Sequence, residues 1–476
     1  MEIVLTIIFL LFTSIFAFGQ TKHTEVKEKE KRPVKVSLLS SYYEQDGDRS
    51  AVNGGWGDQQ LTSFTQEASI YIPVKDSSGI KVFGGVDHYT AASLLQIDKY
   101  KTSASTGTSN VSGDETRIYS TIGYDFANKK KRSILTPSVG FSTEYDVFSI
   151  NAGLSYSKHF IKTGGTLTSS FNFITDRWMV VYPGEFRSTV GTGVDTTTGA
   201  SGGGSGEGEE SGGGSGSGGG SGSGGGIPGY PYPGSGEEYE YGYATPIPVT
   251  GNTITKDGKT YPVDRRNTYS LSNTYSFPVN RRMNAAIGAD FILQRGLLST
   301  PFHRVYFDDG IANEYFKEVR IEKLPRERFK GALHGRFNYF INPFVAVRTQ
   351  ARFYMDTWDI NSVSFNLDVP LKITKWLTLM PFYRYHEQQG SKYYTGYGRH
   401  LSNDTYYTSD IDLADIASHK YGAGLRLTPF ANIGLENEES TRKIFSIKSI
   451  DLRVTSYDRS DGLKATIVSV GLDFDF

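Results

Sequence analysis

The feature that most constrains this chain is an alternation of apolar and polar residues with a period of two. From Val468 to Phe476 every second residue is apolar, and the residues between them are small or acidic. The same pattern recurs at 345–356, 363–369 and 450–455. Because successive side chains of a β-strand point to opposite faces, these segments predict strands with one apolar and one polar face. The predicted fold class is therefore all-β.

Two kinds of sheet fit such strands. A soluble sheet turns its apolar face to a core, whereas a membrane barrel turns it to lipid. The alternating segments run to about 12–16 residues, and soluble strands average about 5–6. Aromatic pairs such as Tyr339–Phe340 and Tyr383–Tyr385 lie near segment ends, where a membrane interface favours them. We therefore predict a transmembrane, antiparallel, up-and-down β-barrel with long extracellular loops.

The turns between these segments predict about 16 strands, with short and long connections on alternate sides. An even number of strands returns the chain to the side from which it started, which is the periplasmic side for an exported protein. The predicted strands are residues 34–45, 62–75, 79–91, 115–126, 133–145, 147–159, 165–177, 264–277, 281–295, 326–340, 343–357, 361–372, 375–388, 416–429, 443–458 and 463–476.

Composition narrows the classes of function. Lys plus Arg number 50 and Asp plus Glu number 51, so no overall charge favours a nucleic-acid partner. The sequence contains no cysteine, which excludes disulfides, thiol catalysis and thiolate metal sites.

The N-terminal residues predict export. Residues 3–18 are almost all apolar, and Ala17 and Gly19 precede an abrupt change to polar sequence. This pattern is typical of a cleaved signal peptide, predicted at 1–19, and a transmembrane anchor is the alternative. The charged segment 20–33 is then a periplasmic lead-in, and residues 34–476 form the barrel. The predicted location is the bacterial outer membrane, with lipid around the barrel and both termini in the periplasm.

One predicted extracellular loop, residues 178–263, is unusually long. It contains a block of glycine and serine from Gly202 to Gly226, followed by a stretch rich in Pro and Tyr. Such a block has too little apolar surface to fold, so we predict a disordered loop. The loop is either an insertion that the barrel tolerates or a tethered segment that captures partners.

Alternation also assigns residues to the lumen. The N-terminal half contributes mainly acids, such as Asp87, Asp125 and Glu144, and the C-terminal half mainly bases. Opposed walls of opposite charge would favour anionic solutes at the basic side. The alternative is a filled barrel whose charges pair across the lumen. The basic candidates are Lys330, Arg336, Arg348, Arg352, Arg384, Lys420, Arg426 and Arg453.

The predicted function is a pore or solute-translocation channel. The alternative is a closed barrel that displays its loops or docks envelope partners. The chain ends on Leu472, Phe474 and Phe476, a pattern that resembles the signal read by the barrel-insertion machinery.

Enzymatic chemistry receives little support from the sequence. No motif places a nucleophile with its base, so we predict no catalytic residue and no cofactor, with an outer-membrane hydrolase as a third alternative. Asp46 and Asp48 are weak candidates for a Ca²⁺ site, but they lack the spacing of a dedicated calcium loop.

Several stretches together resemble an uncharacterised exported family, domain-of-unknown-function family 3570. They are YYEQDGDRSAVNGGWGDQQL from Tyr42, VDHYTAAS from Val86, LSTPFHRVYF from Leu298, EKLPRERFK from Glu322, PFYRYHEQ from Pro381 and YYTSDIDLADIASHKYG from Tyr406. The resemblance implies an outer-membrane barrel without an established activity, and envelope redox proteins as partners.

Most of these stretches fall in outer loops and at strand ends. If they converge, they form a lid at the outer mouth. We predict that charged residues pair within it, and the candidates are Arg304, Arg326, Arg328, Asp410 and Asp412.

Overall fold

A computed structural model of the chain describes residues 32–75, 77–90, 114–183, 186, 251–256, 259–309, 318–429, 436–437, 440–443 and 446–476. The predicted signal peptide at 1–19, most of the lead-in at 20–33 and the Gly/Ser block at 202–226 lie outside the described residues. No helix in the described part of the chain is long and apolar enough to cross a membrane.

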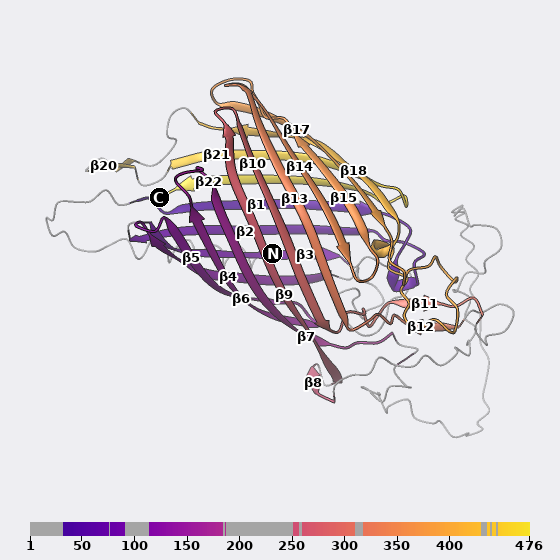
Figure 1. Ribbon diagram of the computed structural model, residues 1–476. Helices are drawn as coiled ribbons and strands as arrows, with labels where there is room; N and C mark the ends of the chain where they lie inside the picture. The colour runs from indigo at the N-terminus through magenta and orange to yellow at the C-terminus, as the bar shows by residue number, and fades with distance from the viewer. Residues whose placement is uncertain are drawn as a thin grey trace, which may run out of the picture. The chain divides into compact units, whose positions relative to one another are not determined.

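Sixteen antiparallel strands close into a barrel (Figure 1). The barrel closes where β1 pairs with β22, in a register that places Lys35 opposite Asp475. In order around the barrel the strands are β1 (Lys35–Asp46), β2 (Leu61–Lys75), β3 (Ser78–Thr90), β4 (Asp114–Asn128), β5 (Ser133–Thr143), β6 (Val147–His159), β7 (Thr166–Met179), β9 (Lys259–Asn280), β10 (Met283–Gly296), β13 (Glu327–Asn342), β14 (Val345–Asp356), β15 (Asn361–Asp368) continued by β16 (Leu371–Lys372), β17 (Leu377–Gln389), β18 (Ile416–Leu427), β21 (Ser446–Arg459) and β22 (Lys464–Asp475).

The predicted fold class is confirmed, and each predicted strand overlaps one strand of the barrel. The largest difference at a strand start is at β9, which begins at Lys259 and extends beyond the barrel to pair with β8 (Thr253–Lys256). The strand predicted at 361–372 is interrupted between β15 and β16. Pro370 lies in this gap and has no N–H to donate to the ladder.

Side chains alternate between an outer apolar face and an inner polar face. On β13, for example, Phe329, Leu333 and Phe337 are exposed on one face, and the even-numbered residues Lys330, His334 and Arg336 have the opposite orientation. The second set faces inward, because Arg453 of β21 reaches Asp368 of β15 at 3.7 Å although β17 and β18 lie between these strands. Such a contact requires the concave side of the sheet. The apolar set therefore covers the outside of the barrel.

The two ends of the barrel differ. Short turns such as 281–282 and 343–344 lie at the end where β1 begins and β22 finishes. Most connections at the other end are longer, and they carry β11 (Arg304–Tyr306), β12 (Val319–Ile321) and the short 3-10 helices η1 (Ala51–Asn53) and η3 (Ile411–Leu413). Figure 1 shows β11 and β12 beyond the ends of the barrel strands. A further small hairpin joins β19 (Glu436–Asn437) to β20 (Ser440–Lys443).

The loop predicted at 178–263 is ordered at both of its ends. Strand β7 continues to Met179, and Val180, Val181 and Tyr182 are buried. On the return, Tyr261 and Val263 of β9 are buried as well. Ordered structure therefore extends further into this segment than the sequence predicts.

Candidate functional site

The predicted lumen residues lie on one wall of the barrel. The strands that carry them are neighbours around the barrel, in the order β13, β14, β15, β17, β18 and β21, and only β15 carries none. We refer to the inner face of these six strands as the basic wall. Along each strand the predicted residues alternate with exposed apolar side chains, such as Phe353 on β14 and Tyr421 on β18.

Three of the eight candidates form ion pairs. Arg352 lies 3.3 Å from Asp290, and Arg426 donates to both oxygens of Asp451 at 2.6 and 3.1 Å. Arg453 lies 3.7 Å from Asp368, and its guanidinium sits 4.5 Å from the centre of the Phe382 ring.

The other five candidates have no such partner. Within the described residues, no hydrogen bond or ion pair reaches the charged groups of Lys330, Arg336, Arg348, Arg384 and Lys420. Arg384 and Lys420 are directly opposite each other on β17 and β18. Like charges in cross-strand pairs repel, so this part of the wall carries uncompensated positive charge.

The opposite wall carries acids, and each of these has a donor. Strands β2, β3 and β4 lie across the barrel from β13, β14 and β15, because each is eight strands, half of the sixteen, away from its counterpart. Tyr119 donates to Glu67 at 2.7 Å, and Lys81 lies 2.8 Å from Asp125. Arg117 lies between two acids, 3.9 Å from Asp87 and 3.5 Å from Glu144. Each of these four acids therefore has a partner on its own wall, although only two of these partners are cations, so this wall keeps a negative charge.

A cavity of about 490 Å³ opens inside the barrel. The residues around it come from nine consecutive strands, from β14 through β22 to β3. They include the charged residues Glu67, Arg348, Asp368, Arg426, Asp451, Arg453 and Asp473, and the apolar residues Leu39, Phe83 and Met380.

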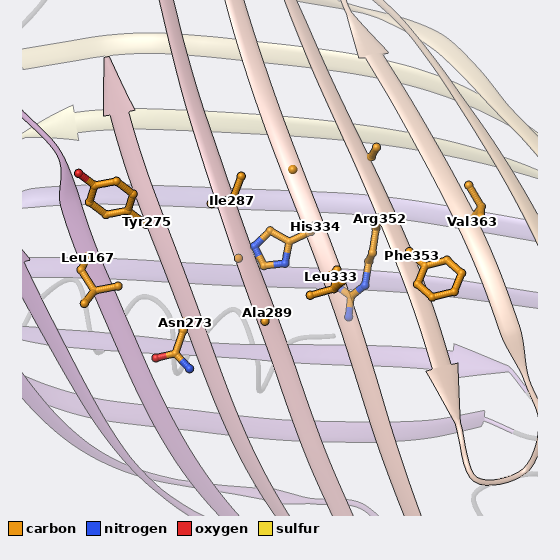
Figure 2. Close-up of a pocket in the computed structure, with 13 residues that line it drawn as sticks. Leu167, Asn273, Tyr275, Ile287, Ala289, Leu333, His334, Arg352, Phe353 and Val363 are labelled. Atoms are coloured by element: carbon orange, nitrogen blue, oxygen red, sulfur yellow. The ribbon is translucent and has the colours of Figure 1, made fainter. Parts of the chain in front are cut away.

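A second cavity, of about 690 Å³, lies on the outer surface. Figure 2 shows Ile287, Leu333, Phe353 and Val363 around it, and all four are exposed. Gly335, which has no side chain, and Ala351, whose side chain is a methyl group, also line this depression in the apolar face.

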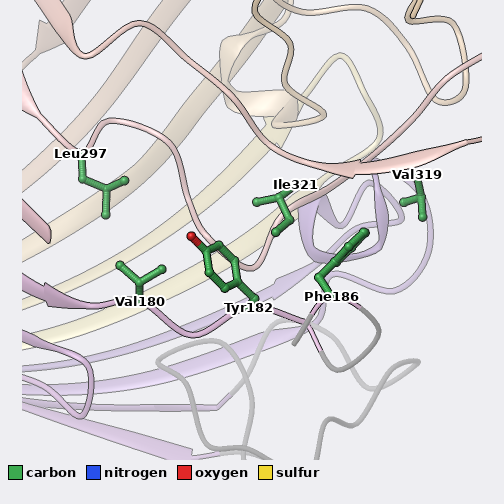
Figure 3. Packing of buried hydrophobic residues seen from close by; sticks show 6 residues of the cluster. All are labelled: Val180, Tyr182, Phe186, Leu297, Val319 and Ile321. Carbon is green, nitrogen blue, oxygen red and sulfur yellow. The ribbon is translucent and has the colours of Figure 1, made fainter. Parts of the chain in front are cut away.

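A folded cap lies at the long-loop end. We define the cap as the described residues of 47–60, 180–186, 297–326 and 390–415. Part of its core is an apolar cluster in which side chains of segments 180–186 and 297–326 come together (Figure 3). The cluster consists of Val180, Tyr182, Phe186, Leu297, Val319 and Ile321, all at most 3% exposed. A smaller cluster joins Val305 and Phe307 to Tyr407.

Glu322 ties the cap together. Its side chain is 2% exposed and accepts a hydrogen bond from the backbone N–H of Thr300 at 2.5 Å. The hydroxyl of Thr408 donates to the same carboxylate, and Nδ1 of His303 lies 3.4 Å from it. The carboxylate therefore joins segment 297–326 to segment 390–415.

Two titratable groups beside Glu322 have shifted pKa values. Burial lowers the pKa of His303, but the hydrogen bond and charge of Glu322 outweigh it and raise the pKa above its ordinary 6.5. Burial raises the pKa of Asp410 to about 6, and the opposing charge of His303 limits the rise.

The predicted convergence of the outer loops is confirmed, but the predicted pairs are not. Lys323 and Tyr407 form a β-bridge, and Ser409 donates to the carbonyl of Arg304 at 2.7 Å. Four of the five charged candidates find partners outside the set, and the fifth, Asp410, accepts from a backbone N–H within it. Arg304 donates to the carbonyl of Val52, Arg326 donates to Asp264, and Arg328 donates to Asp356. Asp412 pairs with Arg459, and Asp410 accepts from the backbone N–H of Asp412.

The central group of the cap was not predicted from the sequence. His303, Glu322 and Thr408 each lie within one of the three family-like stretches LSTPFHRVYF, EKLPRERFK and YYTSDIDLADIASHKYG. Those stretches were therefore the available signal, but no spacing rule connects Glu322 with Thr408, which is 86 residues away.

The remaining candidates take ordinary structural places. Asp46 ends β1 opposite Lys464, and Asp48 lies 3.5 Å from Arg49. No group of three His, Asp or Glu side chains in the described ranges could hold a metal ion. At the C-terminus Phe474 is buried against Phe476, and Leu472 pairs with Leu38 of β1.

Comparison with known proteins gives a match to one family model and general likenesses to solved structures. Residues 251–460 match the model of a family described as "Protein of unknown function (DUF3570)", which confirms the resemblance over that segment. The family-like stretches that begin at Tyr42 and Val86 precede the matched residues. No curated protein matches the chain in sequence.

Several solved structures resemble the chain, at low sequence identity. A bacterial polysaccharide outer-membrane secretin is 9% identical, with a TM-score of 0.39, and the match covers 94% of this chain and 100% of that one. The siderophore receptor PirA from Pseudomonas aeruginosa is 8% identical, with a TM-score of 0.36 and coverages of 94% and 81%. Pseudomonas aeruginosa OccK2 (OpdF) in complex with glucuronate is 8% identical, with a TM-score of 0.35 and coverages of 93% and 98%.

Proposed function

We propose that this chain, which carries the DUF3570 segment on a closed barrel of sixteen strands, is a bacterial outer-membrane protein that forms a gated pore for solutes. The observation that carries the proposal is the division of side chains between the two faces of the barrel. An apolar outer face suits lipid, and a polar, charged inner face suits a channel that holds water. Barrels of 16–18 strands are wide enough for such a channel.

The charges of the inner face support passage of anions. The five cations without a partner among the described residues lie on the basic wall, whereas each acid across the lumen has a hydrogen-bond or ion-pair partner on its own wall. The net field in the lumen is therefore positive near β13–β18, and it raises the local concentration of anions there.

The cap supplies the gate in this proposal. It has its own apolar core and a buried carboxylate, so it is a folded unit with a closed state of some stability. Current through the barrel then depends on how often the cap opens. In the bacterial outer membrane the cap lies on the extracellular side, and both termini lie in the periplasm.

The same cap supports a second candidate function. If it stays closed, the barrel is an interaction platform that presents its loops to envelope partners. The two candidates differ in one measurable property, because only the first conducts ions.

Single-channel recording tests the proposal. The mature protein, beginning at Gln20, is folded in detergent and inserted into a planar bilayer across a KCl gradient. Steps of current with a reversal potential on the anion-selective side support the pore. A barrel that shows the gel-mobility shift of a folded barrel but conducts nothing, even when Glu322→Gln loosens the cap, refutes the pore and favours the interaction platform.

A further inference from the structure

We propose that Arg336, Arg384 and Lys420, with the amides between them, form a binding site for the carboxylate or phosphate group of a solute inside the lumen. The inference rests on the proposed pore and adds to it the place and the chemical class of the solute that the pore recognises.

The strand register places these side chains in one row across the basic wall. Arg336 is opposite Gln350, and Gln350 is opposite Asn366. Asn366 is opposite Arg384, and Arg384 is opposite Lys420. Neighbouring strands lie about 4.8 Å apart. The backbones of Arg384 and Lys420 are therefore one strand spacing apart, and those of Arg336 and Arg384 are three spacings, about 14 Å, apart.

The row contains no carboxylate. It continues to Ala286 beyond Arg336 and to Tyr457 beyond Lys420, and neither residue is acidic. The adjacent row on the long-loop side also contains no carboxylate. Its members are His334, Arg352, Ser364, His386, Ser418 and Arg459. On the other side the single acid is Asp368, which is opposite Arg348 and lies 3.7 Å from Arg453. The nearest acids therefore already have cations of their own.

Uncompensated cations in this row require a counter-charge from outside the protein. Asp290 does not supply it, because Asp290 accepts from Ser272 at 2.6 Å and lies 3.3 Å from Arg352. In a confined lumen the effective dielectric constant is lower than in bulk water, so an anion near Arg384 and Lys420 gains more Coulomb energy there.

The chemistry of the row selects oxyanions. A guanidinium presents two parallel N–H groups, which match the two oxygens of a carboxylate or phosphate. The ammonium of Lys420 adds a point charge, and the amides of Gln350 and Asn366 can donate to further oxygens. A channel needs such binding to be weak enough for release, and exposed cations on flexible side chains satisfy this condition.

The test compares variants of this row with a paired cation of the same wall. Arg384→Gln/Lys420→Gln removes two charges and keeps polar side chains of similar reach. Arg426→Gln is the matched control, because Arg426 is held on both oxygens of Asp451 and lies outside the row. Single-channel current is recorded while inorganic phosphate or acetate is added in separate arms.

In the unmodified protein we expect phosphate, acetate or both to reduce the current in a saturable way. The double variant should raise the half-blocking concentration at least tenfold and shift the reversal potential toward cation selectivity, and Arg426→Gln should change each by less than twofold. If the double variant fails to fold, Lys420→Gln alone should still raise the half-blocking concentration about threefold.

The outcomes separate this site from the pore itself. A conducting pore that neither anion blocks, or one whose block is unchanged in the double variant, overturns the site and leaves the pore intact. If the unmodified protein does not conduct, the pore fails. The site is then tested by the phosphate-dependent rise in thermal midpoint of the detergent-folded barrel. A rise that the double variant loses supports the site, and no rise in the unmodified protein overturns it.

Discussion

The substitution Glu322→Gln tests the role of the cap most directly. It removes one charge from a side chain that is 2% exposed and keeps the volume nearly unchanged. The carboxylate accepts from the backbone N–H of Thr300 and the hydroxyl of Thr408, and it lies beside His303. An amide has one acceptor oxygen, so its NH₂ group must face a donor on one side.

The size of the effect follows from these contacts. A hydrogen bond to a charged group contributes about 1.5–3 kcal/mol, and a buried donor left without an acceptor costs about 1–3 kcal/mol. Loss of one such bond, together with the lost attraction to His303, gives a destabilisation of about 2–4 kcal/mol. Since 1.4 kcal/mol corresponds to a factor of ten, the cap should open roughly 30- to 700-fold more often.

Hydrogen–deuterium exchange with peptide resolution measures this opening. Protection should fall in segments 297–309, 318–326 and 390–415 and stay unchanged in the barrel strands β4–β6, which lie outside the cap. Glu327→Gln is the control, because Glu327 pairs with Arg295 at 2.6 Å and both side chains are 60% exposed. An exposed pair contributes at most about 1 kcal/mol, so the control should change exchange by about fivefold or less.

Equal exchange in the two variants would refute the reasoning, because the buried carboxylate would then stabilise the cap no more than an exposed one. Loss of protection throughout the barrel would also contradict it. That result would mean that Glu322 supports the whole fold and not a separate gate.

Three further results are expected. Cap protection should fall as pH rises from 4.5 to 7.5, because Asp410 and His303 have raised pKa values and the closed cap holds more protons than the open one. For Asp410, a pKa of about 6 against an ordinary 3.8 limits its contribution to the free energy of cap opening to about 3 kcal/mol. Asp410→Asn should remove most of the pH dependence of cap protection, measured as protection factors corrected for intrinsic exchange. Asp356→Asn should lower the free energy of unfolding in urea by about 3 kcal/mol, since the fully buried carboxylate pairs with Arg328 and accepts from the Trp358 N–H at 2.8 Å. A loss no larger than that of the exposed Asp359→Asn would contradict this expectation. Phe474→Ala should destabilise the barrel seam by about 3 kcal/mol and reduce the fraction with folded-barrel gel mobility, because Phe474 is 3% exposed beside Val36 of β1. An unchanged folded fraction would count against it.

The strands and their faces were predictable because both depend on local sequence. A strand has a side-chain period of two whatever lies beside it, so Val468 to Phe476 reveals its apolar face without any partner. The lumen candidates Arg336, Arg384 and Lys420 follow from the same parity. The break at Pro370 was not predicted, because the alternation continues on both sides of it.

The pairing of particular charges depended on register and on loops, which local sequence does not contain. Arg384 and Lys420 come to stand side by side because β17 and β18 align in one register, and a shift of one residue would separate them.

By itself, then, the sequence determined the all-β class, the strand segments and the apolar side of each strand, since these properties are set by neighbours two residues apart. The tertiary structure alone decided that Glu322 meets Thr408 and that Arg326 meets Asp264. It also decided that five cations of the lumen have no ion-pair partner among the described residues. These contacts join residues that are far apart in the chain and meet only when the barrel closes, so they cannot be predicted from the local periodicity of the sequence.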